Sequence, residues 1–117
     1  MIAARLSSAA LAFSGLAAVV APDRVATALA VPASTGRGRA ETRAGLGGTF
    51  AALGLWALVS SDPQAARAVG VTWLGASAAR LASLVIDEPE TDSAFWAYLA
   101  AELVFGLTAI VGSKRPR

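Results

Sequence analysis

The sequence has 117 residues, of which 56% are hydrophobic and 15% are charged, and its formal net charge is +2. Soluble domains typically contain about 25% charged residues, so this composition favours a single membrane domain, residues 1–117. The absence of cysteine and histidine removes disulfides, thiolate chemistry and the usual ligands of zinc and haem. We expect no metal, no other cofactor and no nucleic-acid partner, and interpret the basic tail at 114–117 as a membrane-flanking anchor.

Four hydrophobic segments are each long enough to cross the ~30 Å hydrocarbon core of a bilayer. They predict helices at about 2–20, 41–60, 64–86 and 93–112. A soluble four-helix domain would need a polar face repeating at every turn, and the second and fourth segments contain too few polar residues for one. The predicted fold is therefore all-α, a four-transmembrane-helix bundle.

The first segment has a second interpretation, as a signal peptide, because Arg5 precedes the apolar run and residues 19–21 could form a cleavage site. Three further hydrophobic segments follow, so we favour a membrane helix. Apolar residues at 24–31 predict a short interfacial helix between the first two spans, which Ser34-Thr35-Gly36 then ends. Asp92 or Ser93 can cap the last helix by accepting hydrogen bonds from its free N–H groups.

Three glycines, Gly45, Gly47 and Gly48, lie near the start of the second segment. A phosphate-binding loop needs a strand before its glycines and a helix after them, whereas these lie inside a helical pattern. Close packing of membrane helices through small residues is the favoured interpretation.

Charged residues inside the hydrophobic segments are the main functional signal. Arg80 lies within the third segment, and Asp87 follows seven residues later, on the same helix face and ~10 Å further along the axis. Glu102 lies at the centre of the last segment. An unpaired charge at mid-depth costs at least ~2.5–3.5 kcal/mol, so such residues normally face a partner and mark a functional-site hypothesis.

Spans joined by short turns alternate in direction, which predicts that Glu41, Arg43, Arg80, Asp87 and Glu102 converge on one half of the bundle. The sequence leaves open which carboxylate pairs with Arg80. Two carboxylates around one arginine can differ in pKa, one ionised and one protonated, as an acid and a base require. A salt-bridge network that fixes the helix register is the structural alternative.

Two groups of candidate site residues follow from this arrangement. The predicted catalytic residues are Glu102, Arg80, Asp87 and Glu41. The predicted substrate-binding residues are Arg43, Tyr98, Ser83 and Trp73.

The motifs Glu41-x-Arg43-Ala44-x-x-Gly47-Gly48 and Arg80-Leu81-x-Ser83-x-x-x-Asp87-x-Pro89, followed by Glu102, span most of the chain. This pattern resembles DUF4345, a family of small bacterial four-helix membrane proteins classed as a domain of unknown function. The resemblance implies a membrane location and a shared polar site, without an established activity.

Three functions compete. The first is a cofactor-independent acid–base enzyme that isomerises, cyclises or opens an epoxide of a lipophilic small molecule. The second is a non-catalytic scaffold, accessory subunit or lipid binder, whose small-residue faces around Gly45, Gly48 and Gly75 would favour a homo-oligomer. The third is a proton or small-ion pathway, for which the chain is small.

Basic residues divide almost evenly between the two sides of the predicted bundle. We expect a multi-pass protein of the cytoplasmic (inner) membrane with both termini cytoplasmic.

Overall fold

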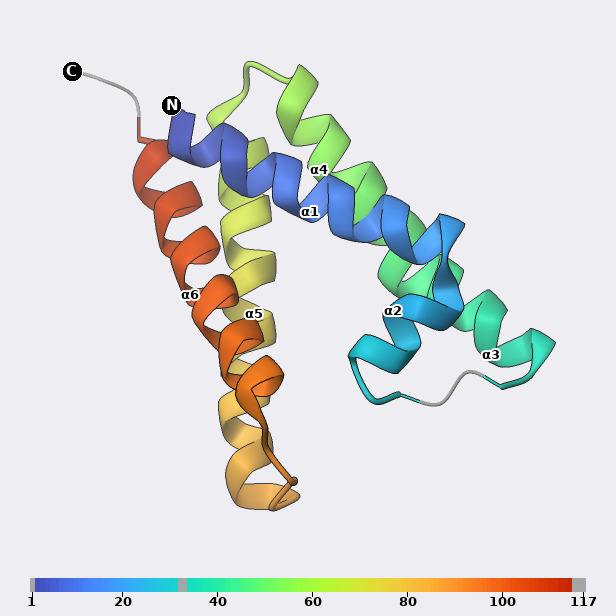
Figure 1. The fold of residues 1–117 in the computed structure, drawn as a ribbon. Helices are drawn as coiled ribbons and strands as arrows, with labels where there is room; N and C mark the ends of the chain where they lie inside the picture. Colours follow the sequence, from blue (N-terminus) through green and yellow to red (C-terminus); the bar gives the residue numbers. More distant parts are fainter. Residues whose placement is uncertain (1, 32–33, 115–117) are drawn as a thin grey trace.

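The structure is a computed structural model that describes residues 2–31 and 34–114. Within these ranges all regular structure is helical (Figure 1). The elements are α1 (Ile2–Val20), α2 (Pro22–Ala28), α3 (Gly36–Glu41), the π-helix η1 (Thr42–Gly48), α4 (Thr49–Val59), α5 (Pro63–Ile86) and α6 (Ser93–Gly112).

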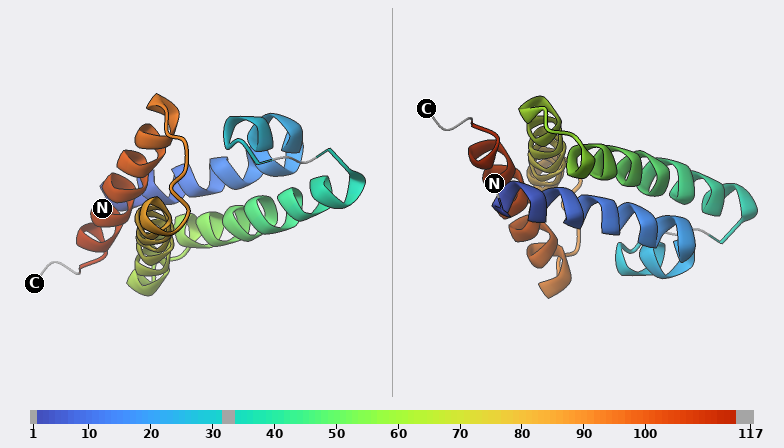
Figure 2. Two further views of the ribbon diagram at one scale, coloured as in Figure 1. Left: turned by 90° about the horizontal axis from the view of Figure 1, so that it is seen from below. Right: turned by 90° about the horizontal axis from the view of Figure 1, so that it is seen from above.

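The helices form two antiparallel hairpins. In one, α1 packs on η1 and α4, and in the other α5 packs on α6. Figures 1 and 2 show the hairpins in contact at the end where α1 begins and diverging toward the opposite end. Contact between them is made mainly by α1 and α6. The molecule therefore has a packed end and an open end.

Glycines allow the helices within each hairpin to approach closely. A Cβ on Gly54 of α4 would lie 2.7 Å from the carbonyl oxygen of Ser8 in α1, and one on Gly15 would lie 2.5 Å from that of Gly47. The predicted packing role is therefore confirmed for Gly47. Gly45, by contrast, has no neighbour within 4 Å of such an added Cβ.

Ser7 joins three helices at the packed end. Its fully buried hydroxyl donates to the carbonyl oxygen of Phe105 at 2.8 Å and lies 2.9 Å from the hydroxyl of Thr108 in α6. The indole N–H of Trp73 in α5 donates to the Ser7 carbonyl oxygen at 3.2 Å. Hydrogen bonds of this kind hold helices together where no water competes for the polar groups.

Three helices of the described chain, α1, α5 and α6, are long and apolar enough to cross a membrane. They coincide with three predicted segments, and they expose large apolar side chains such as Phe13 (75%) and Val85 (82%). The remaining predicted segment, 41–60, the second in the chain, is different. It is divided between the end of α3, η1 and α4, and α4 has only 11 residues. The prediction of four long apolar helices is thus corrected to three.

The π-helical turns explain this division. The backbone N–H of Thr49 donates to the carbonyl oxygen of Ala44, five residues earlier, which is the π-helical pattern. The Thr49 hydroxyl donates to the same oxygen at 3.1 Å, and the adjoining glycines bring no side chain that would resist the wider turn. Segments of π-helix usually interrupt α-helices over about one turn.

The predicted short helix between the first two spans is present as α2, with different ends. It starts at Pro22, whose fixed φ suits the first helical turn. It ends at Ala28, shortly before Ala30, whose φ of 56° leaves the helical region. Of the predicted basic tail, residues 115–117 lie outside the described residues.

Candidate functional site

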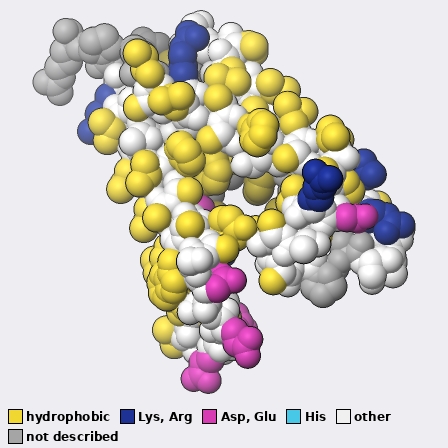
Figure 3. Space-filling view, in the orientation of Figure 1, with side chains coloured by type: hydrophobic (Ala, Val, Ile, Leu, Met, Phe, Trp, Pro, Cys, Tyr) yellow, Lys and Arg dark blue, Asp and Glu magenta, His cyan; other side chains and the backbone are white. Residues whose placement is uncertain are grey.

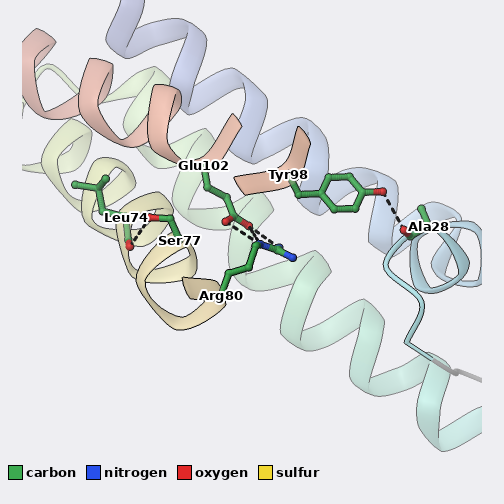
Figure 4. Close-up of polar contacts among 6 residues, drawn as sticks. All are labelled: Ala28, Leu74, Ser77, Arg80, Tyr98 and Glu102. Atoms are coloured by element: carbon green, nitrogen blue, oxygen red, sulfur yellow. Dashed lines mark hydrogen bonds and ion pairs between the residues drawn. The ribbon is translucent and has the colours of Figure 1, made fainter. Parts of the chain in front are cut away.

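Arg80 and Glu102 form an ion pair between the middle of α6 and the second half of α5. The Nε of Arg80 donates to the two carboxylate oxygens of Glu102 at 3.2 and 3.0 Å, and Nη2 donates to Oε1 at 2.6 Å (Figure 4). A fork of this type is among the strongest charge-assisted contacts in proteins. The structure thus identifies Glu102 as the partner of Arg80 among the alternatives that the sequence left open.

The two members of the pair differ in exposure. The Glu102 side chain is 8% exposed, whereas that of Arg80 is 23% exposed. The pair uses Nε and Nη2 of the guanidinium, and Nη1 makes no hydrogen bond to a described residue. The carboxylate is therefore enclosed while one edge of the guanidinium faces outward.

Two aromatic rings complete the surroundings of Arg80. Its Cζ lies 5.2 Å from the ring centroid of Phe95 and 5.7 Å from that of Tyr98. Phe95, Tyr98 and Glu102 are spaced by three and four residues, so they share one face of α6. This face of α6 therefore supplies two aromatic rings for cation–π contacts with Arg80, as well as the carboxylate that pairs with it. Phe95 was not among the predicted site residues, although its position seven residues before Glu102 is a signal that could have identified it.

Tyr98 also connects the two hairpins. Its hydroxyl donates to the carbonyl oxygen of Ala28, the last residue of α2, at 2.9 Å (Figure 4). Carbonyl groups at a helix C-terminus have no partner within the helix, so this one is free to accept. Tyr98 therefore lies between the ion pair and the hairpin that contains α1.

The other predicted site residues lie in separate contacts. Asp87, just after the end of α5, is exposed and accepts a hydrogen bond at 2.5 Å from Ser83 in the last turn of that helix. Glu41 pairs with Arg37 one turn earlier in α3 at 2.8 Å, with both side chains exposed. Arg43 donates to the carbonyl oxygen of Val19, near the end of α1.

The predicted convergence is therefore found for Arg80 and Glu102, and not for Asp87, Glu41 or Arg43. For Glu41 and Arg43 the physical reason is that the hairpins diverge, which separates the start of the second segment from α5 and α6 (Figure 1). Asp87 lies about two turns beyond Arg80, just after the end of α5. Trp73, predicted to contact substrate, packs against Phe105 with ring centroids 5.4 Å apart. Trp73 therefore belongs to the contact of three helices around Ser7.

Two pockets lie away from the ion pair. One, of about 290 Å³, is formed by the ends of α1, α4, α5 and α6 at the packed end, and the other, of about 490 Å³, lies between α2 and α3. Neither is lined by Arg80 or Glu102. The first pocket was not predictable from sequence, because it depends on how four helix ends meet.

Comparison with known proteins identifies one family. The model of the domain of unknown function DUF4345 matches residues 1–113, almost the whole chain. Comparisons with curated proteins and with solved structures gave no match. The match covers α1 to α6 and includes Arg80 and Glu102. The chain therefore belongs to the DUF4345 family.

Proposed function

We propose that this is an integral protein of the cytoplasmic membrane in which Arg80 and Glu102 form an acid–base site for a lipophilic small molecule. The observation that supports the proposal most is an ion pair between two helices that are long and apolar enough to cross a membrane. Charges in that position are costly in lipid and are associated with substrate or proton chemistry.

The proposal includes a fourth crossing by α3, η1 and α4 together. These elements follow one another without a break from Gly36 to Val59, and the uncharged part, 44–59, would extend roughly 24 Å as a helix. The hairpins diverge (Figure 2), so both can cross the bilayer only if each is tilted from the membrane normal. Tilts of up to about 40° occur in membrane proteins. Four crossings place both termini on one side, which we assign to the cytoplasm.

The geometry favours one type of reaction among those considered. With Asp87 and Glu41 elsewhere, the site offers a single carboxylate, so the group that removes a proton must also return it. Isomerisation meets this condition. Glu102 takes a proton from a carbon beside a substrate carbonyl, an N–H of Arg80 stabilises the resulting oxyanion, and Glu102 returns the proton two carbons further along. Cyclisation and epoxide opening normally need a separate acid, for which Tyr98, one turn before Glu102 on the same face of α6, is the candidate.

A proton-exchange experiment tests this proposal. The full chain in lipid nanodiscs is incubated in D₂O with a long-chain β,γ-unsaturated ketone, and deuterium uptake and double-bond position are followed by mass spectrometry and NMR. We expect uptake with the wild-type chain, loss with Glu102→Gln, and strong reduction with Arg80→Lys. Glu41→Gln is the matched control, because it removes an exposed carboxylate outside the site. Exchange by Glu102→Gln at the wild-type rate would refute the acid–base role.

A scaffold is the second candidate, and a specific observation favours it. Gly75 of α5 and Gly45 have no neighbour within 4 Å of an added Cβ, whereas Gly70 and Gly106 contact the facing helix. Exposed small residues would let a second copy approach closely. If association is the function, the mass in detergent should be that of an oligomer, and Gly75→Leu should convert it to a monomer while Glu102→Gln does not.

A further inference from the structure

The pocket of about 290 Å³ at the packed end lies where α1, α4, α5 and α6 meet. It is separate from the Arg80–Glu102 site. It is bounded by the first turns of α1, the turn between α4 and α5, and the end of α6. Its volume is at the lower end of the range for small-molecule sites, ~300–1,000 Å³. If these helices cross the bilayer, their ends lie at the depth of the lipid headgroups.

The lining of this pocket is amphipathic. Apolar groups come from Ala4, Ala57, Leu58 and Ala66, and hydroxyl groups come from serines of three chain segments. The serines are Ser8, Ser60, Ser61 and Ser113. Ser8 and Ser113 already donate to the carbonyl oxygens of Ala4 and Ile110, so Ser60 and Ser61 are the lining serines left to donate to a ligand. A ligand that fits such a lining has a polar head with hydrogen-bond acceptors and an apolar body.

Basic side chains dominate the charge of the pocket. Arg5 and Lys114 line it, and neither forms an ion pair with a described residue. Arg67 lies next to the lining, since its Nε donates to the hydroxyl of Ser113 at 3.4 Å. The one acidic lining residue, Asp62, is already engaged, because it caps α5 by accepting from the backbone N–H of Gln64 at 2.9 Å. The charge balance therefore favours an anion.

Figure 3 shows how charge is distributed over the molecule. Basic side chains lie at the end where α1 begins and also around α2 and α3, whereas acidic side chains gather at the tip of the α5–α6 hairpin. Between the packed end and that tip the surface in Figure 3 is largely apolar. Leu6 and Val111, which adjoin the lining residues Arg5 and Gly112 in sequence, are exposed. Acyl chains attached to a headgroup in the pocket would lie along such a surface.

We propose that this pocket binds the phosphate group of an anionic phospholipid, held by Arg5 and Lys114 and by the hydroxyls of Ser60 and Ser61. Basic pockets between membrane helices are a recurring site for anionic headgroups. A phosphodiester supplies the negative charge for the two cations and acceptor oxygens for these two serines. The acyl chains remain in the bilayer, so only the headgroup has to fit the pocket.

Native mass spectrometry of the full chain in detergent tests the assignment. The probes are phosphatidylglycerol, phosphatidylcholine with the same acyl chains, and glycerol 3-phosphate as the soluble source of phosphate. We expect phosphatidylglycerol to bind most tightly. The double variant Arg5→Gln/Lys114→Gln should weaken its binding about ten- to thirtyfold, as expected for two cations near a membrane surface.

The matched control is Arg24→Gln/Arg37→Gln, which removes the same charge from exposed positions far from the pocket. It should change phosphatidylglycerol binding less than twofold. Arg5→Lys keeps the charge and should retain most of the binding, and thermal unfolding checks that each variant is folded. Equal losses in both double variants, or equal affinity for phosphatidylcholine, would overturn the site. Equally tight binding of glycerol 3-phosphate would overturn the assignment to a lipid.

Discussion

Arg80 and Glu102 lie 22 residues apart in the chain and on different helices, yet their side chains share three hydrogen bonds, the shortest 2.6 Å. The pair is the main polar link between α5 and α6 in the half of their hairpin that diverges from α1 and α4. Its asymmetry, an enclosed carboxylate and a partly exposed guanidinium, determines how the protein should respond when either partner is changed.

Removing one partner should cost more than removing both. Arg80→Leu leaves the Glu102 carboxylate enclosed and unpaired, and we expect about 3 kcal/mol of destabilisation, the lower end for a buried pair because Arg80 is partly exposed. The double variant Arg80→Leu/Glu102→Leu should recover much of that loss, since no charge is left behind. Unfolding of the chain in detergent micelles, measured as a double-mutant cycle, checks this. Additive losses would show that the two side chains do not depend on each other.

Tyr98→Phe should loosen the contact between the hairpins at the open end. The change removes the hydrogen bond to the Ala28 carbonyl oxygen, worth about 1 kcal/mol, and keeps the ring beside Arg80. The chain has no cysteine, so spin labels can be attached to new cysteines at exposed positions 27 and 97. The distance distribution should broaden in Tyr98→Phe and stay narrow in Trp96→Phe, which changes an exposed ring. An unchanged distribution would mean that other contacts hold the hairpins.

Local features of this fold were predictable from sequence, whereas the relative placement of its hairpins was not. Asp92 caps α6 by accepting from the backbone N–H of Phe95 at 2.9 Å, as its position before an apolar run indicates. The partner of Arg80 depends on which helix lies opposite, and helical periodicity describes one helix at a time. The separation of Glu41 from Arg80 results from the divergence of the two hairpins, which meet at the packed end through close contacts such as that of Gly112 with Ala4. Those contacts involve backbone atoms, which a pattern of side chains does not reveal.

The glycine contacts give a prediction with an internal control. Gly54→Ala places a Cβ 2.7 Å from the Ser8 carbonyl oxygen, so α1 and α4 must move apart, and we expect a loss of about 1–3 kcal/mol. Gly75→Ala adds the same atom on α5, where nothing lies within 4 Å, and should stabilise the helix by up to about 1 kcal/mol. Thermal unfolding of the two variants compares them directly. A destabilised Gly75→Ala would indicate that α5 is covered there by another chain, as the scaffold proposal requires.

The exposed carboxylates give the last prediction, which concerns the extent of the site. Glu41 forms an exposed pair with Arg37, and such pairs contribute about 0–1 kcal/mol. Asp87 is exposed just after the end of α5 and bonds only to Ser83 among the described side chains. Glu41→Gln and Asp87→Asn should therefore leave both stability and ketone exchange close to wild type, while Glu102→Gln abolishes exchange. If Asp87→Asn also abolished exchange, a second carboxylate would have to reach the substrate, and α5 would have to rearrange to bring it there. The distinction matters for the chemistry, because one carboxylate suffices for isomerisation, whereas an acid and a base acting together need two groups.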